Sequence, residues 1–214
     1  TNNFGYETKM MINVLLRETN VSLLNLDGDW AGVDKGALIL LKSGIVPTYA
    51  FGDFDSVTKE ELKFLKSHLE IDVVQSEKDY TDTELCLLSL VEEGYTVIDV
   101  YGAFGGRMDH TLMNIHLLQN DALREVNIHL KDKENDLSLL NSGKHNITNK
   151  GFKYVSIIPI HENTILSLEE LKYELNEENI SPGKTLTVSN EFIGDVATVT
   201  TNKDILLIHS MDKR

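Results

Sequence analysis

Short β-branched and apolar segments alternate with amphipathic segments through the first 130 or so residues of the chain. This alternation is typical of βα units that form a parallel sheet covered by helices. Thr58 and Thr81 each stand three residues before a glutamate, which is the capping-box pattern of a helix start. We expect strands at 12–16, 30–34, 48–52, 71–75, 96–101 and 126–130, and helices at 35–42, 58–69, 81–93 and 109–123.

The pattern changes after about Lys131, where β-rich segments are separated by Asn, Gly and Ser clusters without helical periodicity. This predicts a small antiparallel sandwich, with residues 169–179 forming either a helix or a hairpin. We therefore expect a Rossmann-like α/β domain with a parallel sheet at 11–131, and a β-sandwich at 132–214. Residues 1–10 fit neither and are expected to be a disordered leader or an expression remnant. The sandwich strands are expected at 154–158, 165–168, 185–189, 196–200 and 205–209.

Composition narrows the functional classes. The 214 residues carry a formal net charge of -14, with 20 basic against 34 acidic side chains, which argues against a general nucleic-acid binder. The longest apolar run, Ala37 to Leu41, is too short to span a membrane, and no secretion signal is visible, so the cytoplasm is the expected location. The single cysteine, Cys86, allows neither an internal disulfide nor a cysteine metal site.

Acidic residues follow several of the predicted parallel strands. Asp34 ends the second strand, Asp53 and Asp55 follow the third, and Asp79 and Asp82 follow the fourth. Ligands of open parallel sheets bind beyond the carboxyl ends of the strands, so these side chains can converge. Clustered carboxylates repel one another unless a cation lies among them, and oxygen ligands favour Mg²⁺ over zinc.

A glycine-rich loop, Gly102 to His110, follows the strand that ends at Tyr101. Its glycines leave backbone N–H groups open to phosphate, and Arg107 offers a planar fork that matches phosphate oxygens. Together with a magnesium site, this loop predicts a binding site for a nucleotide polyphosphate.

Several of these residues could also have a purely structural role. Asp82 could complement a helix dipole, Asp109 could cap a helix, and Lys78 could be a solvated charge. Such motifs follow several strands in succession, whereas chance would scatter them over both sheet edges, and this favours a functional site.

Three motifs in this order and spacing resemble the thiamin pyrophosphokinase family: GDFDSV at 52–57, KDYTDTE at 78–84 and GAFGGRMDHTLMNI at 102–115. The resemblance covers nearly the whole chain from Met11. It implies a homodimer of α/β and β-sandwich domains, with thiamin bound between the subunits. It also implies transfer of a diphosphate from ATP to the thiamin hydroxyl, with AMP as the second product.

The resemblance also implies roles for particular residues. Asp53, Asp55 and Asp79 would hold Mg²⁺ and form the catalytic group with Arg107, and one aspartate would serve as any base that the hydroxyl needs. Ser189 and Asn190 match the family's Ser-Asn segment and would line the thiamin pocket. The nucleotide and its phosphates would contact Asp34, Lys78, Asp82, Gly105, Gly106, Arg107 and Asp109.

The sequence departs from the family at two places. Arg17-Glu18-Thr19 follows the first strand, where many members have a glycine-rich turn. The C-terminal half has no tryptophan to stack on thiamin, so Phe192 or a tyrosine would have to replace it.

Two other functions are compatible with the sequence. The acceptor could be another hydroxymethyl heterocycle, such as a pterin, because the acceptor site lies in the half with fewer motifs. Alternatively, the protein could be a non-catalytic module that senses Mg-nucleotide, although binding alone requires fewer carboxylates than this chain carries.

Overall fold

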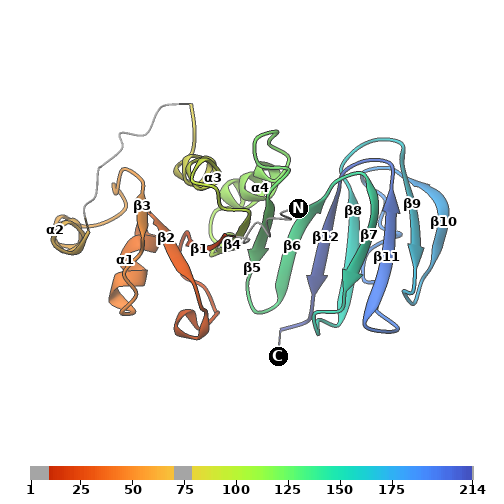
Figure 1. Ribbon diagram of the computed structural model, residues 1–214, viewed down its shortest axis with the longest axis horizontal. Helices are drawn as coiled ribbons and strands as arrows, with labels where there is room; N and C mark the ends of the chain where they lie inside the picture. The colour runs from red at the N-terminus through yellow and green to blue at the C-terminus, as the bar shows by residue number, and fades with distance from the viewer. Residues whose placement is uncertain (1–9, 70–78, 214) are drawn as a thin grey trace, which may run out of the picture. The chain divides into compact units, whose positions relative to one another are not determined.

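The computed structural model describes residues 10–69 and 79–213, and the chain divides into two compact units, Thr1–Ile128 and His129–Arg214 (Figure 1). The division falls inside strand β5 (Asn127–Lys131). Almost all of the expected leader, and the strand expected at 71–75, lie outside the described residues. No helix in the described part of the chain is both long and apolar enough to cross a membrane.

The N-terminal unit contains four of the six strands predicted for the parallel sheet, in the order β3-β2-β1-β4, whereas the strand predicted at 126–130 is β5 and pairs antiparallel with β6 (Asn135–Leu140). These are β1 (Met11–Leu15), β2 (Asp29–Val33), β3 (Tyr49–Phe51) and β4 (Val97–Tyr101). The helices are η1 (Leu23–Asn25), α1 (Lys35–Lys42), α2 (Lys59–His68), α3 (Asp82–Glu92) and α4 (Met108–Leu117). The α/β prediction is confirmed, although α4 ends six residues before the expected end at Leu123.

The predicted helix caps are present. At α2, the Thr58 hydroxyl accepts a bond from the Glu61 backbone N–H at 3.2 Å, and the Glu61 carboxylate accepts one from the Thr58 N–H at 2.9 Å. At α3, the Thr81 hydroxyl accepts from the Glu84 N–H at 3.2 Å. The Glu84 carboxylate accepts instead from the Asn120 side chain, so only half of that capping box forms. These caps satisfy backbone donors that the first helical turn leaves open.

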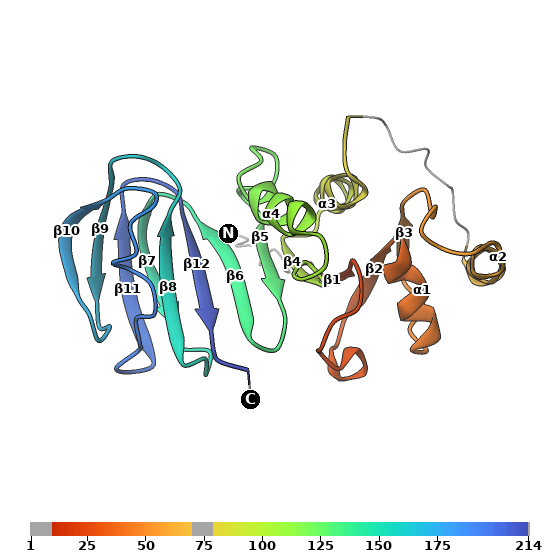
Figure 2. The ribbon, with the colours of Figure 1, turned by 180° about the vertical axis from the view of Figure 1, so that it is seen from behind.

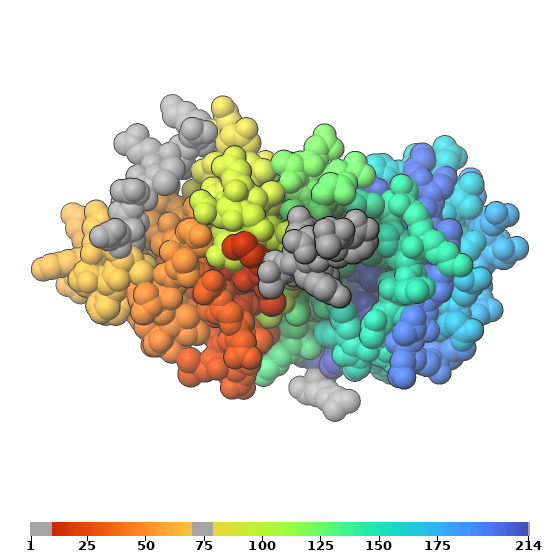
Figure 3. Space-filling view, viewed as in Figure 1, coloured from red at the N-terminus to blue at the C-terminus, as the bar shows by residue number. Residues whose placement is uncertain are grey.

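The core of the N-terminal unit lies where α1 packs against the strands. Leu15, Trp30, Leu40 and Tyr101 form one buried cluster, in which the Trp30 and Tyr101 rings lie 5.8 Å apart. Helix α3 packs against β2 and β3, and in the space-filling view its yellow-green surface borders the orange part of the chain (Figure 3). This packing of helices on the strands holds in place the strand ends that carry the acidic motifs.

The C-terminal unit is an antiparallel β-sandwich, as predicted (Figure 2). One layer has the order β5-β6-β12-β8 and the other β10-β9-β11-β7. Buried aliphatic side chains from both layers, such as Ile157, Leu166, Val199 and Leu207, fill the space between them. The strands after β5 are β6 (Asn135–Leu140), β7 (Gly143–Thr148), β8 (Tyr154–Pro159), β9 (Thr164–Glu169), β10 (Leu175–Ile180), β11 (Val196–Thr201) and β12 (Ile205–Ser210).

The sandwich differs from the sequence prediction in several strands. Residues 185–189 form turns instead of a strand, and the Thr187 hydroxyl donates to the carbonyl of Ile157. Strands β6 and β7 were not predicted, because β6 alternates leucines with the buried polar residues Asp136 and Ser138, and β7 is mostly polar and buries only Ile147. For residues 169–179 the hairpin alternative is the correct one, since β10 pairs antiparallel with β9.

Candidate active site

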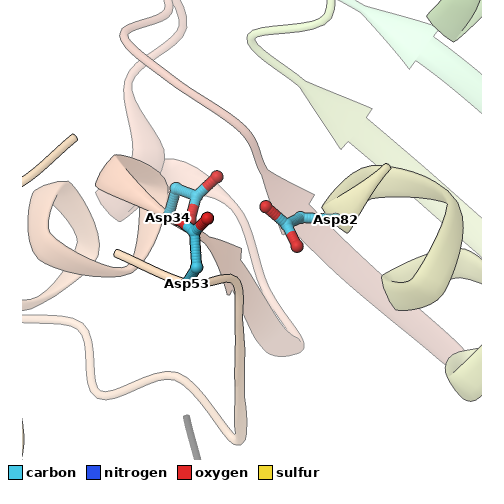
Figure 4. A group of neighbouring side chains, drawn as sticks. All are labelled: Asp34, Asp53 and Asp82. Atoms are coloured by element: carbon cyan, nitrogen blue, oxygen red, sulfur yellow. The ribbon is translucent and has the colours of Figure 1, made fainter. Parts of the chain in front are cut away.

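Three aspartates meet at the carboxyl ends of β2 and β3. Asp34 follows β2 as the N-cap residue of α1, Asp53 follows β3, and Asp82 is the first residue of α3. One carboxylate oxygen of each lies within 4.8 Å of the other two, and the side chains point toward one another (Figure 4). Elements far apart in sequence therefore build a compact group of oxygen ligands.

The backbone around Gly52 makes room for this cluster. Gly52 has φ +125°, and a Cβ atom there would lie 2.0 Å from Oδ1 of Asp34. That oxygen accepts a bond of 3.3 Å from the backbone N–H of Phe54, a buried residue with φ 57°. The Gly-Asp-Phe-Asp turn thus wraps around the Asp34 carboxylate, and any side chain at Gly52 would displace it.

The electrostatics of the cluster favour a cation. Burial raises the pKa of Asp34 from 3.8 to about 7, with further contributions from Asp82 and Asp53 that outweigh the bond from the Phe54 N–H. Burial also raises the pKa of Asp82, and the charges of Asp53 and Asp55 act in the same direction. Carboxylates that resist ionising together are stabilised by a hard cation, and an oxygen-only set of this kind suits Mg²⁺.

The other predicted metal ligands lie outside this group. Asp55 is exposed, and its backbone N–H donates to Oδ1 of Asp53 at 3.0 Å, which places it beside the cluster. Asp79 is exposed and is not among the converging carboxylates. Lys78 lies outside the described residues. The structure joins Asp53 to Asp34 and Asp82, which were expected to contact the nucleotide, while metal ligation by Asp55 and Asp79 stays a prediction.

The glycine-rich loop lies between β4 and α4. Gly105 and Gly106 are exposed and have φ values of +84° and +69°, which glycine adopts without strain. Arg107 is the N-cap residue of α4, and its guanidinium binds both carboxylate oxygens of Asp109, at 3.1 and 2.5 Å. The Arg107 bond lowers the pKa of Asp109. Asp109 is therefore an ion-pair partner of Arg107 and not the helix cap.

Sequence reasoning did not assign Arg17 to this loop. Nη1 of Arg17 donates a bond of 2.7 Å to the carbonyl oxygen of Gly105. Its sequence position could have indicated this contact, because Arg17 directly follows the first predicted strand and therefore lies at the same sheet edge as the motifs.

The predicted thiamin segment is held by a buried asparagine. The Asn190 side chain donates to the Tyr173 carbonyl at 2.8 Å and accepts from the Tyr173 and Glu191 N–H groups at 3.0 Å each. Ser189 is exposed with φ 60°, and its N–H donates to Oγ of Ser156 at 2.9 Å. Asn190 thus fixes the shape of this segment, whereas Ser189 faces solvent.

The two aromatic candidates beside this segment differ in exposure. Phe192 is partly buried against the sandwich core, and its ring stacks on His209 at 5.8 Å. Tyr173 is 59% exposed and next to the Asn190 anchor. Of these two rings, Tyr173 is the one that a ligand can reach, and the Lys172 ammonium lies 5.5 Å from the centre of its ring.

These features define a class of protein in which an α/β unit with a carboxylate cluster and a glycine-rich loop at its strand ends is followed by a β-sandwich. The chain matches the sequence models "Thiamin pyrophosphokinase, catalytic domain" over residues 22–130 and "Thiamin pyrophosphokinase, vitamin B1 binding domain" over residues 144–206. The chain therefore belongs to the thiamin pyrophosphokinase family, which confirms the resemblance drawn from its motifs.

Individual relatives agree with this membership. The chain is 40% identical over 185 residues to a thiamine pyrophosphokinase of Bacillus subtilis, covering 84% of this chain and 85% of that protein. A crystal structure of thiamine pyrophosphokinase from Bacillus subtilis is similar with a TM-score of 0.86 at 37% identity, covering 95% of this chain and 100% of that one. The thiamin pyrophosphokinase structure from Geobacillus thermodenitrificans also has a TM-score of 0.86, at 33% identity over 95% and 99% of the two chains.

Proposed function

We propose that this protein transfers the diphosphate of ATP to the hydroxyl of thiamin, giving thiamin diphosphate and AMP. The observation that carries the proposal is the convergence of Asp34, Asp53 and Asp82 at the strand ends of a chain from this family. The match to a vitamin B1 binding domain favours thiamin over a pterin as the acceptor. A cluster of mutually repelling carboxylates favours catalysis over simple nucleotide sensing, because sensing requires fewer charges.

Magnesium is the metal that these residues fit. Asp34, Asp53 and Asp82 would hold it, with Asp55 and Asp79 as further expected ligands or supports. Their ligand atoms are all carboxylate oxygens, and burial, followed by the charges of Asp82 and Asp53, raises the pKa of Asp34, so a cation would offset the cost of ionising it. Bound Mg²⁺ would supply charge neutralisation on the phosphate oxygens.

In the reaction, the thiamin hydroxyl gives its proton to a base, for which one of the aspartates is expected, and its oxygen bonds to the β-phosphorus of ATP. The bond from that phosphorus to the oxygen shared with the α-phosphate breaks, and AMP leaves with the electron pair. The chain contributes mainly positioning and electrostatic stabilisation. Gly105 and Gly106 would present N–H groups to the polyphosphate, and the Arg107 guanidinium would stabilise the transferred or leaving group, with Asp109 orienting it.

The acceptor would bind beside the Ser189 segment. Ser189 offers an exposed hydroxyl, Asn190 fixes the segment, and Tyr173 offers an exposed ring for an aromatic heterocycle. Leu186 and Ile193, in the same unit as the Ser189 segment, are 62% and 63% exposed, and a partner chain over this surface would bury them. We propose a homodimer whose active sites draw on both chains, located in the cytoplasm, where ATP is supplied.

The test is product identification. Protein incubated with ATP, Mg²⁺ and thiamin should form AMP and thiamin diphosphate in equal amounts, and chelation should stop turnover. Asp53→Asn should reduce turnover about 100-fold or more, by analogy with the loss of one preorganised electrostatic group. Asp121→Asn removes the same charge from a side chain that is 99% exposed and should leave turnover unchanged.

Two outcomes would contradict the proposal. Formation of ADP and thiamin monophosphate would exclude diphosphate transfer. A large drop in the melting temperature of metal-free Asp53→Asn would mean that Asp53 has a structural role instead.

A further inference from the structure

Arg17 follows β1, and its guanidinium reaches the glycine-rich loop after β4. The two strands are parallel neighbours, and Leu15 pairs with Tyr101 at their carboxyl ends. The residues that follow both strands therefore lie close together, and Nη1 of Arg17 donates a 2.7 Å bond to the Gly105 carbonyl oxygen. The end of the first strand carries no recognisable motif, yet it contributes the positively charged side chain of Arg17 to the loop.

Two glycines of the loop leave the space that Arg17 occupies. A Cβ atom on Gly102 would lie 2.6 Å from the carbonyl oxygen of Arg17 and 2.7 Å from its amide nitrogen. A Cβ atom on Gly106 would lie 1.9 Å from Nη1 of Arg17. Real Cβ contacts are essentially never this short, so a side chain at Gly102 would move the backbone and one at Gly106 would displace the guanidinium.

Charge distinguishes Arg17 from Arg107. The Arg107 guanidinium donates two hydrogen bonds to the Asp109 carboxylate, which offsets part of its charge. Arg17 donates instead to a neutral carbonyl, and in the described part of the chain no carboxylate lies within salt-bridge distance of its guanidinium. A guanidinium carries five N–H donors, so the bond to Gly105 leaves Arg17 with donors and charge to bind an anion.

We propose that Arg17 binds a phosphate group of the nucleotide. The Gly105 carbonyl fixes the guanidinium, and the remaining N–H groups donate to phosphate oxygens held against the loop. This inference rests on the proposed function in taking the anion to be the polyphosphate of ATP. Arg17 then touches the substrate directly, at a position where sequence motifs give no indication of it.

Calorimetric titration with Mg²⁺ and α,β-methylene ATP, without thiamin, tests the proposal, because the analogue resists cleavage at the reacting bond. Arg17→Gln should weaken its binding about 10- to 100-fold, as expected for one hydrogen bond to a charged group. Arg17→Lys should recover part of the affinity by restoring the charge. The matched control is Arg124→Gln, which removes the same charge where Arg124 lies near Asp121 and Glu125 and should leave affinity unchanged.

Adenosine separates phosphate binding from a structural role. Its binding should be the same in Arg17→Gln and in the unaltered protein, because it carries no phosphate. Equal affinity of both proteins for the ATP analogue would overturn the proposal. An equal loss for adenosine and the analogue would also overturn it, because the substitution would then disturb the whole site.

A double-mutant cycle tests the contact itself. Gly106→Ala should displace the Arg17 guanidinium and weaken analogue binding, but it should cost less in the Arg17→Gln background, where the clash at Nη1 is absent. Strictly additive losses would contradict the contact. Product analysis of the unaltered protein remains independent: Arg17-dependent binding without thiamin diphosphate formation would overturn the proposed function alone.

Discussion

Replacing Asp34 with asparagine is expected to stabilise the metal-free protein at pH 8 and to reduce the pH dependence of its stability. The folded protein raises the pKa of this carboxyl from 3.8 to about 7, mainly through burial and then through the charge of Asp82. Between these values the folded state binds a proton that the unfolded state has released. The free energy of unfolding therefore falls as pH rises from about 4 to about 7, and above pH 7 the full penalty is present.

The size of the effect follows from this difference. About three pKa units correspond to roughly 4 kcal/mol, at 1.36 kcal/mol per unit. Asp34 is only partly buried, so solvent screening should reduce the measured penalty to about 1–2 kcal/mol. Asparagine cannot ionise, yet its carbonyl oxygen can still accept the Phe54 N–H bond that Asp34 accepts at 3.3 Å. Asparagine also tolerates the positive φ of 48° at this position better than most residues.

Urea denaturation in the presence of a chelator, at several pH values from 4.5 to 8, measures the difference in free energy of unfolding between Asp34→Asn and the unaltered protein. The advantage of Asp34→Asn over the unaltered protein should grow with pH, whereas Asp121→Asn, on an exposed side chain, should show no such trend. With Mg²⁺ and nucleotide the order should reverse, because only the carboxylate can gain from the cation. A difference that does not change with pH, or a less stable variant at pH 8, would refute the argument.

Two further predictions concern the sandwich and the assembly. Burial lowers the pKa of His209 from 6.5 to about 4, so stability should fall as pH drops through this range. His209→Phe keeps a ring against Phe192 and should reduce the change in the urea denaturation midpoint between pH 6.5 and 4. The same pH dependence in the variant and the unaltered protein would contradict this prediction. If the sites are shared, mixing inactive Asp53→Asn and Asn190→Ala chains after dissociation should restore about a quarter of normal activity. Confirmed heterodimers without activity would place both residues in one chain's site.

Local sequence determined most of the secondary structure of the N-terminal unit. The helix starts at Thr58 and Thr81 were predictable because a cap depends only on residues within one turn. The parallel strands were predictable because their apolar runs alternate with amphipathic helices. In the sandwich, β7 was missed because a strand with one solvent-facing side can be mostly polar, and only its partner β11 shows that it is a strand.

The candidate site was predictable as a location but not as a set of ligands. The motifs after successive strands placed it at one sheet edge, because parallel strands end on the same side. The Asp-x-Asp pattern suggested that Asp53 and Asp55 would converge. In the structure Phe54 has a positive φ, and the N–H of Asp55 bonds back to the Asp53 carboxylate. The carboxylates that join Asp53 come from Asp34 and Asp82 instead.

The sequence by itself determined the α/β and β-sandwich organisation, the family and the edge of the sheet where the acidic cluster lies, because these depend on periodicity and on motifs of neighbouring residues. Only the tertiary structure decided which carboxylates lie close together, and that Arg17 reaches the Gly105 carbonyl across 88 positions of sequence. Such contacts depend on the register of β1 against β4 and on the space left by Gly52, Gly102 and Gly106. Distances of a few ångströms between remote segments are set by packing, which a linear pattern does not record.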